Sequence, residues 1–78
     1  MTRPTRAEMN ELAADREKSA ARSAANAQSG REAAADPKLS DNTRKQAAAA
    51  AEFAARHAQD YREEAEALRD GRLPGEDA

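Results

Sequence analysis

Side chains that could carry chemistry gather around the single histidine of the chain. His57, Asp60, Tyr61 and Glu64 stand at i, i+3, i+4 and i+7, a spacing that places them on one face of a helix. An imidazole beside carboxylates could bind a metal ion or transfer a proton. The Glu-x-x-His pair of di-iron bundles is missing, because Ala54 stands three residues before the histidine, and so is the His-Glu-x-x-His pattern of zinc enzymes. We therefore expect a solvated or interface histidine, with no catalytic residue, no cofactor and no metal site.

Basic residues raise the question of nucleic acid as a partner. Lys38, Arg44 and Lys45 are close together near the middle of the chain, where they could meet phosphate groups. Acidic residues interleave with the basic ones, the formal net charge is −2, and only Phe53 and Tyr61 could stack on bases. Nucleic acid is therefore not the expected partner. The alternative function is an accessory regulator that binds nucleic acid or a partner protein through this basic segment.

Bulky apolar residues, which a protein core needs, are scarce. Leu, Ile, Val and Phe together account for five of the 78 residues, whereas alanine occupies 22 positions. So low a content of bulky apolar residues is typical of disordered chains. The small net charge and the high helix propensity of alanine nevertheless favour an all-α protein. Because the chain has no cysteine, neither a disulfide nor a thiolate metal site can stabilise the fold, and association with another chain is the remaining means.

Local signals in the first half of the chain predict a disordered segment over residues 1–4 and a helix over residues 5–35. Thr5 and Glu8 have the spacing of a capping box, in which each side chain accepts a hydrogen bond from the other residue's backbone amide. Gly30 allows two alternatives. It could end the helix early as a left-handed residue, or it could stay helical because a second helix lies close to it.

A second helix is predicted over residues 42–70. The segment "ADPKLSDN", residues 35–42, precedes it and breaks helical structure, because the residue before a proline avoids helical dihedral angles and Ser, Asp and Asn favour caps. At the far end, Gly71 is expected to adopt the left-handed C′ conformation and Leu73 to fold back as the C″ contact, with the next proline preventing continuation. Residues 71–78 then form a cap and a short acidic tail.

Two helices of similar length joined by a short connection predict an antiparallel hairpin, and alanines recur along both helices with coiled-coil spacing. We call the positions that follow this spacing the seam; Tyr61 and Leu68 continue it beyond the alanines. The seam consists of Ala13, Ala20, Ala27 and Ala34 on the first helix, and Ala47, Ala51, Ala54, Ala58, Tyr61, Ala65 and Leu68 on the second. Alanine permits close helix approach, but its methyl group contributes far less than a buried leucine. A single hairpin is therefore expected to be marginally stable.

This marginal stability favours a homodimer that forms a four-helix bundle. The alternatives are a monomeric hairpin and a helix pair that folds on binding a different protein. The residues expected at the interfaces are Met9, Leu12, Ala20, Ala24, Phe53, Ala54, Tyr61 and Leu68.

The expected function is that of a small, non-enzymatic, self-associating helical module for interaction or assembly. No apolar run is long enough to span a bilayer, and no signal peptide's apolar region follows Met1. A cytoplasmic protein without membrane contact is therefore expected.

Overall fold

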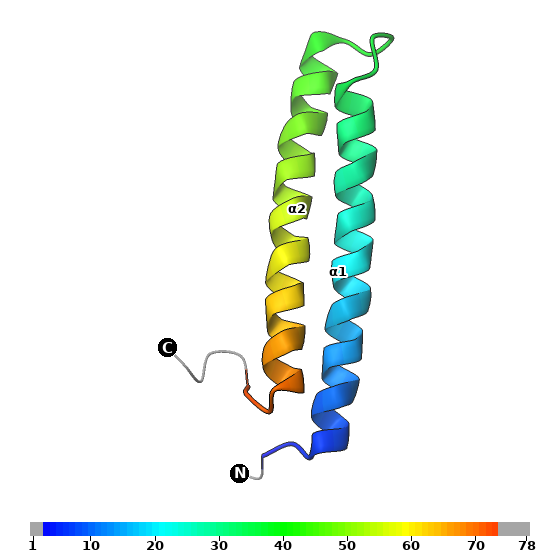
Figure 1. Cartoon of the computed structure of the whole chain (residues 1–78). Coiled ribbons are helices and arrows are strands. Elements are labelled where there is room, and N and C mark those ends of the chain that lie inside the picture. Colours follow the sequence, from blue (N-terminus) through cyan, green and yellow to red (C-terminus); the bar gives the residue numbers. More distant parts are fainter. Residues whose placement is uncertain (1–2, 74–78) are drawn as a thin grey trace.

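The computed structural model describes residues 3–73, and these form two long helices packed side by side as an antiparallel hairpin (Figure 1). Helix α1 spans Arg6–Ala34 and helix α2 spans Asp41–Arg69. The described residues contain no strand. The prediction of an all-α helical hairpin is confirmed, and each observed helix end lies one residue from its expected position. The acidic tail and the proline expected to follow Leu73 lie outside the described residues.

A capping box begins α1, as the sequence predicts. The amide of Glu8 donates to Thr5 Oγ1 at 3.1 Å, and the amide of Thr5 donates to Glu8 Oε1 at 2.9 Å. Two of the backbone donors that a helix start leaves unpaired are satisfied in this way. The backbone hydrogen bond from Thr5 also lowers the pKa of Glu8 below its ordinary value.

The connection between the helices, residues 35–40, is a turn built around Asp36 and Pro37. The amide of Lys38 donates to Asp36 Oδ1 at 2.9 Å, and the amide of Leu39 donates to the Asp36 carbonyl at 3.2 Å. Proline at the second position of such a turn fixes the backbone angle that the turn requires. Ser40 then caps α2 by accepting a 3.1 Å hydrogen bond from the amide of Thr43, so α2 begins one residue earlier than expected.

A Schellman motif ends α2. Gly71 has a φ of 81°, and its amide donates to the carbonyl of Leu68 at 3.1 Å, while the amide of Arg72 donates to the carbonyl of Ala67 at 2.8 Å. The left-handed glycine is confirmed. The C″ position belongs to Arg72 rather than to Leu73, but Leu73 still folds back and packs on the core at this end.

Two arginines near the start of the chain link it to the end of α2. This end of the hairpin, opposite the turn, is called the open end. Arg6 Nη1 donates to the carbonyl of Arg69 at 2.7 Å, and Arg3 Nη2 donates to the carbonyl of Gly71 at 3.2 Å. Carbonyls at the end of a helix lack partners within the helix and carry partial negative charge, so cationic donors are favourable there. The two ends of the described chain are therefore held side by side.

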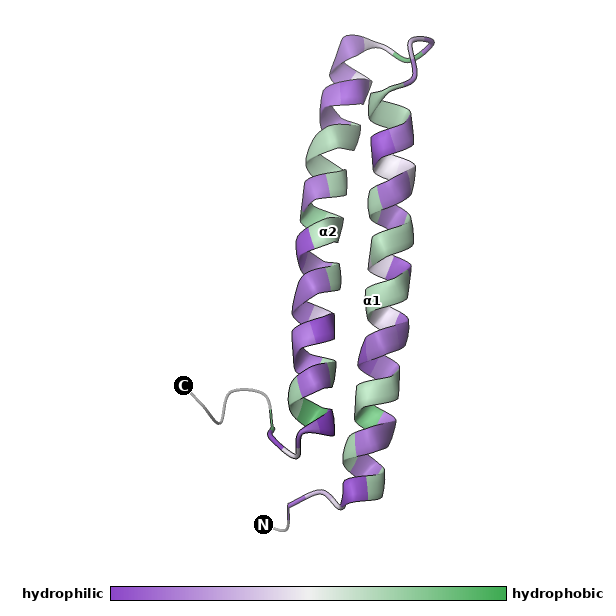
Figure 2. Cartoon of the chain, in the orientation of Figure 1, coloured by the Kyte–Doolittle hydropathy of each residue, from purple (hydrophilic) through white to green (hydrophobic). Residues whose placement is uncertain are grey.

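Alanine dominates the core between α1 and α2. Among residues 3–73, the buried ones are Met9, Ala13, Ala20, Ala27, Ala51, Ala58, Ala65 and Leu68. The two bulky members, Met9 and Leu68, cluster with Ala13 and Ala65 at the open end, and strongly hydrophobic residues appear at that end of both helices in Figure 2. Towards the turn the core consists of alanine methyl groups, so the seam holds the helices close together without much side-chain volume.

Gly30 lies within α1, at a level where α2 comes so close that there is no room for a side chain. A Cβ atom placed on Gly30 would be 2.8 Å from the Cβ of Ala51 and 2.9 Å from the carbonyl oxygen of Ala47. The alternative in which Gly30 ends the first helix is wrong, since α1 continues to Ala34. The glycine costs helix propensity, and close packing of the two backbones offsets that cost.

Acidification is expected to destabilise the hairpin. Arg69 Nε lies 2.6 Å from Glu17 Oε1, and this hydrogen bond lowers the pKa of Glu17 below its ordinary value of 4.5, in the same direction as the shift at Glu8. A carboxyl whose pKa is depressed by folding adds stability above its unfolded pKa and loses it as the pH falls through the folded pKa. The thermal midpoint, followed by circular dichroism, should be level above about pH 5.5 and should fall below about pH 4.5. A chain with Glu8→Gln and Glu17→Gln should show a shallower fall, and an identical profile would contradict this account.

Candidate functional site

Helix α2 carries a row of three rings on its surface. The ring centroids of Phe53 and His57 are 4.3 Å apart and tilted by 49°, and those of His57 and Tyr61 are 6.3 Å apart in an edge-to-face arrangement. The spacing of four residues places the rings along one face of the helix. Among residues 3–73, no group of three or more His, Cys, Asp or Glu side chains is arranged to hold a metal ion. His57 lies between two aromatic rings, tilted against Phe53 and edge-to-face with Tyr61.

Leu12 lies on the same side of the hairpin as these rings. Arg16, one turn after Leu12 on α1, places its Nε atom 2.9 Å from Glu64 Oε2, and Glu64 lies one turn after Tyr61 on α2. Since this ion pair links the two rows of residues, both rows border the same face. We call the surface formed by Leu12, Phe53, His57 and Tyr61 the aromatic face. Leu12 is 39% exposed and Phe53 is 56% exposed, which makes them the exposed large apolar residues of the described chain.

The residues that the sequence assigned to interfaces fall into three groups. Met9, Ala20 and Leu68 are buried between α1 and α2, Ala24, Ala54 and Tyr61 are half-buried, and Leu12 and Phe53 are exposed. Contact within one hairpin accounts for the buried group. A second chain could reach Leu12, Phe53 and Tyr61 without any rearrangement of the hairpin.

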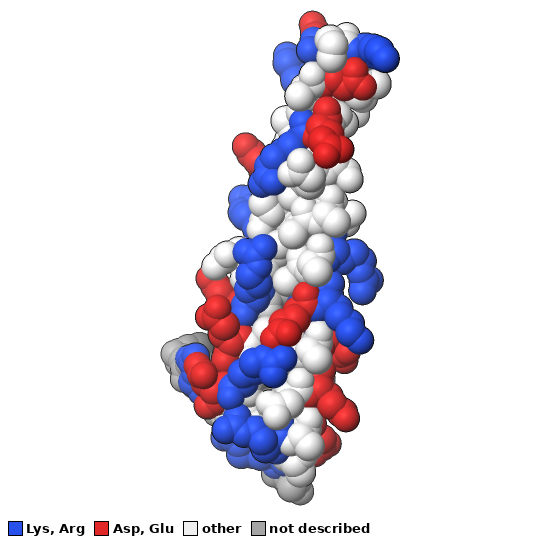
Figure 3. All heavy atoms as spheres, turned by 45° about the vertical axis from the view of Figure 1, so that its right-hand side comes forward, with Lys and Arg blue, Asp and Glu red and all other residues white. Residues whose placement is uncertain are grey.

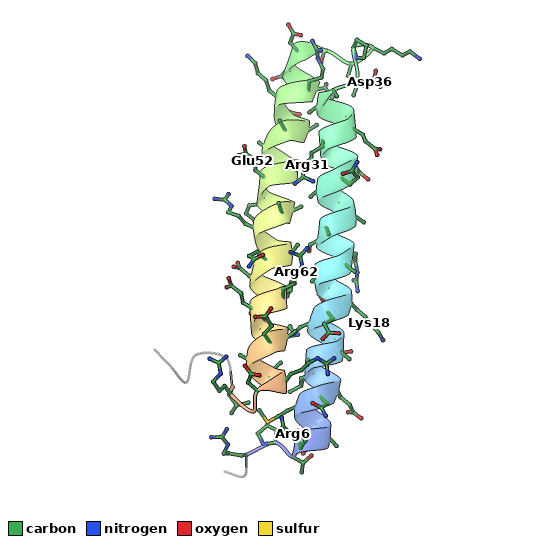
Figure 4. The ribbon with its side chains drawn as sticks, in the orientation of Figure 1. Arg6, Lys18, Arg31, Asp36, Glu52 and Arg62 are labelled. Carbon is green, nitrogen blue, oxygen red and sulfur yellow. The ribbon has the colours of Figure 1, made fainter. Side chains whose placement is uncertain are left out.

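A groove that the sequence analysis did not find lies on the other side of the seam. Its volume is about 650 Å³, and its lining consists of five alanines with Arg31, Glu52 and Arg56. Smaller hollows extend it towards the turn, where Arg44 and Lys45 line it, and towards the open end, where Arg62 does. We call this continuous surface the alanine groove. Figure 4 shows Arg31 and Arg62 between the two helices on the side that faces the viewer.

Helical geometry explains why the two surfaces lie on opposite sides. Tyr61, at one edge of the seam, follows the buried Ala58 by three positions, whereas Arg62 follows Ala58 by four, and these steps turn to opposite sides of Ala58 at 3.6 residues per turn. Ala55 likewise follows the seam residue Ala51 by four positions and lines the groove. The signal in the sequence is the pair Ala48 and Ala55, small residues seven positions apart that each directly follow a seam alanine.

Cations predominate in the alanine groove. Five Lys and Arg side chains and two carboxylates line the groove and its extensions. Arg44 forms an ion pair with Asp41, but within residues 3–73 no ion pair involves Arg31, Lys45, Arg56 or Arg62. Figure 3 shows basic side chains beside uncharged surface near the middle of the hairpin. The groove therefore combines an apolar floor with excess positive charge.

Comparison with protein-family models, with curated proteins and with solved structures finds no match to this chain. Within the described residues, neither helix is apolar enough over sufficient length to cross a membrane. Function must therefore be inferred from the surfaces of the hairpin itself.

Proposed function

We propose that this chain is a small, non-enzymatic interaction module that associates with a second copy of itself through the aromatic face, forming a four-helix bundle. The observation that carries the proposal is the exposure of Phe53 and Leu12 on one face, beside the half-buried Tyr61 and Ala54. Phe53 begins the row of three rings on this face, and aromatic residues are enriched at protein–protein interfaces.

The composition of the core supports an additional contact surface. Six of the eight buried residues in the described part of the chain are alanines, so the hairpin buries little apolar area for its length. Full burial of a Phe or Leu side chain contributes about 1.5–3 kcal/mol, and about half of the Phe53 side chain remains to be covered. A two-fold symmetric contact would use each such residue twice, because both copies present the same surface.

Charge favours the aromatic face over the alanine groove as the self-contact. Arg16 and Glu64 neutralise each other within the hairpin, and the helix also places the carboxylate of Asp60 on this side, so two aromatic faces bring less like charge together than two grooves would. Two alanine grooves placed together would instead repel each other, because each groove carries an excess of positive charge. Self-association should therefore leave the groove open.

Phe53→Glu is expected to disrupt the association while leaving the single hairpin folded. The substitution removes apolar area and adds a negative charge twice in each dimer, so the dissociation constant should increase by about 100-fold or more. Sedimentation velocity across a concentration series measures the effect, and circular dichroism at the same concentrations reports whether the helices persist.

Ala48→Glu is the matched control. It adds the same charge to an exposed position of α2 that lines the alanine groove, so the dissociation constant should change by less than about threefold. A wild-type chain that sediments as a monomer at all concentrations would disprove self-association. Equal weakening by the two variants would show that the aromatic face is not the contact.

A further inference from the structure

We propose that the alanine groove binds an acidic amphipathic helix of a partner protein. The proposal is independent of self-association, since the groove and the aromatic face lie on opposite sides of the seam. Its basis is the combination of groove shape, small side chains on the floor, and basic side chains that lack carboxylate partners among residues 3–73.

The floor of the groove suits a third helix. Ala34, Ala48 and Ala55 contribute only methyl groups there, so little side-chain volume holds an incoming helix away from these positions. From Arg44 to Arg62 the groove follows about 18 residues of α2, a length of about 27 Å. A helix of about five turns would fill it, with apolar residues at intervals of three and four against the alanine floor.

The charges specify the flanks of that helix. Arg31 projects from α1 and Arg62 from α2 on the same side of the hairpin (Figure 4), and Lys45 and Arg56 lie at the α2 edge of the groove. Carboxylates on either side of the apolar stripe would pair with these cations as the groove is covered. Rim charges of this kind select the partner and set the association rate more than they add raw affinity.

Two other occupants fit less well. A second copy that presents its own groove would bring cations against cations, as described above. Single-stranded nucleic acid would find positive charge, but the lining contains no aromatic side chain on which bases could stack. An apolar floor with basic edges therefore matches an acidic helix best.

The test uses the full chain and a fluorescent acidic probe peptide of about 18 residues, with Leu and Ala on one helical face and Glu on both flanks. A second peptide has Lys in place of every Glu, and a third probe is a single-stranded oligonucleotide. Fluorescence anisotropy titrations at low and physiological salt give the dissociation constants. The acidic peptide is expected to bind at least about tenfold more tightly than the basic peptide.

Paired variants locate the binding surface. Replacing Arg31→Gln together with Arg62→Gln should weaken binding of the acidic peptide by about tenfold or more. The control, Lys18→Gln with Arg22→Gln, removes the same charge from exposed positions on the outer side of α1, where Lys18 points away from the hairpin (Figure 4). It should change binding by less than about threefold.

Two single variants complete the test. Ala48→Glu should weaken binding of the acidic peptide, because it places a carboxylate in the groove, whereas Phe53→Glu should leave this binding intact even where it abolishes self-association. The proposal is overturned if the acidic peptide does not bind at about 1 mM, if both double variants lose binding equally, or if only the oligonucleotide binds and the groove variants abolish that binding.

Discussion

Ala58→Glu is expected to unfold the hairpin. Ala58 is 2% exposed and lies on the seam between α1 and α2. A carboxylate at this position has to be buried without a partner, which costs several kcal/mol, or has to force the helices apart. A chain of this size with so thin a core has a net stability of only about 5 kcal/mol. The helical circular dichroism signal at 222 nm should therefore fall by more than half at 25 °C.

Ala49→Glu is the control for this substitution. It makes the same chemical change in α2 at an exposed position away from the seam, so its effect on the free energy of unfolding should be within about 0.5 kcal/mol. Both variants are compared with the parent at one protein concentration, since self-association would add concentration-dependent stability. Retention of full helicity by Ala58→Glu would mean that the seam is not the contact between the helices.

Gly30→Ala is expected to destabilise the protein even though alanine is the better helix former. At an exposed helical position the change would stabilise by about 1 kcal/mol. At Gly30 the new methyl group would stand 2.8 Å from the Cβ of Ala51 and 2.9 Å from the backbone oxygen of Ala47. Neither neighbour is the end of a flexible side chain, so α1 and α2 must move apart near the turn. Overpacking typically costs 1–3 kcal/mol, and we expect a net loss of about 1 kcal/mol in the free energy of unfolding.

Ser29→Ala separates packing from propensity. Ser29 is exposed in the same turn of α1, so its replacement raises helix propensity without meeting α2 and should stabilise by a few tenths of a kcal/mol. Urea unfolding followed by circular dichroism gives both free energies. If Gly30→Ala were the more stable of the two variants, the close approach of the helices at this level would be refuted.

The sequence by itself determined where the two helices begin and end. Thr5 with Glu8, the Asp36–Pro37 step, Ser40 and Gly71 act through hydrogen bonds and dihedral preferences that involve residues only a few positions apart. Such signals do not require knowledge of the other helix, which explains why each expected end lies within one residue of the observed end. The recurrence of alanine every seven residues is likewise a local pattern, and it identified the face that each helix buries.

Only the tertiary structure decided what lies on either side of that face. Whether Gly30 breaks or continues α1 depends on how near Ala51 lies, and this distance depends on the register of the two helices. The same register placed Leu12 on the side of the hairpin that carries the ring row, as the contact of Arg16 with Glu64 shows, and it set Arg31 of α1 in a groove with Ala48 and Ala55 of α2. These contacts join residues 17 to 48 positions apart in the chain. Their geometry depends on how two alanine-lined surfaces fit together, and neither helix encodes that fit alone.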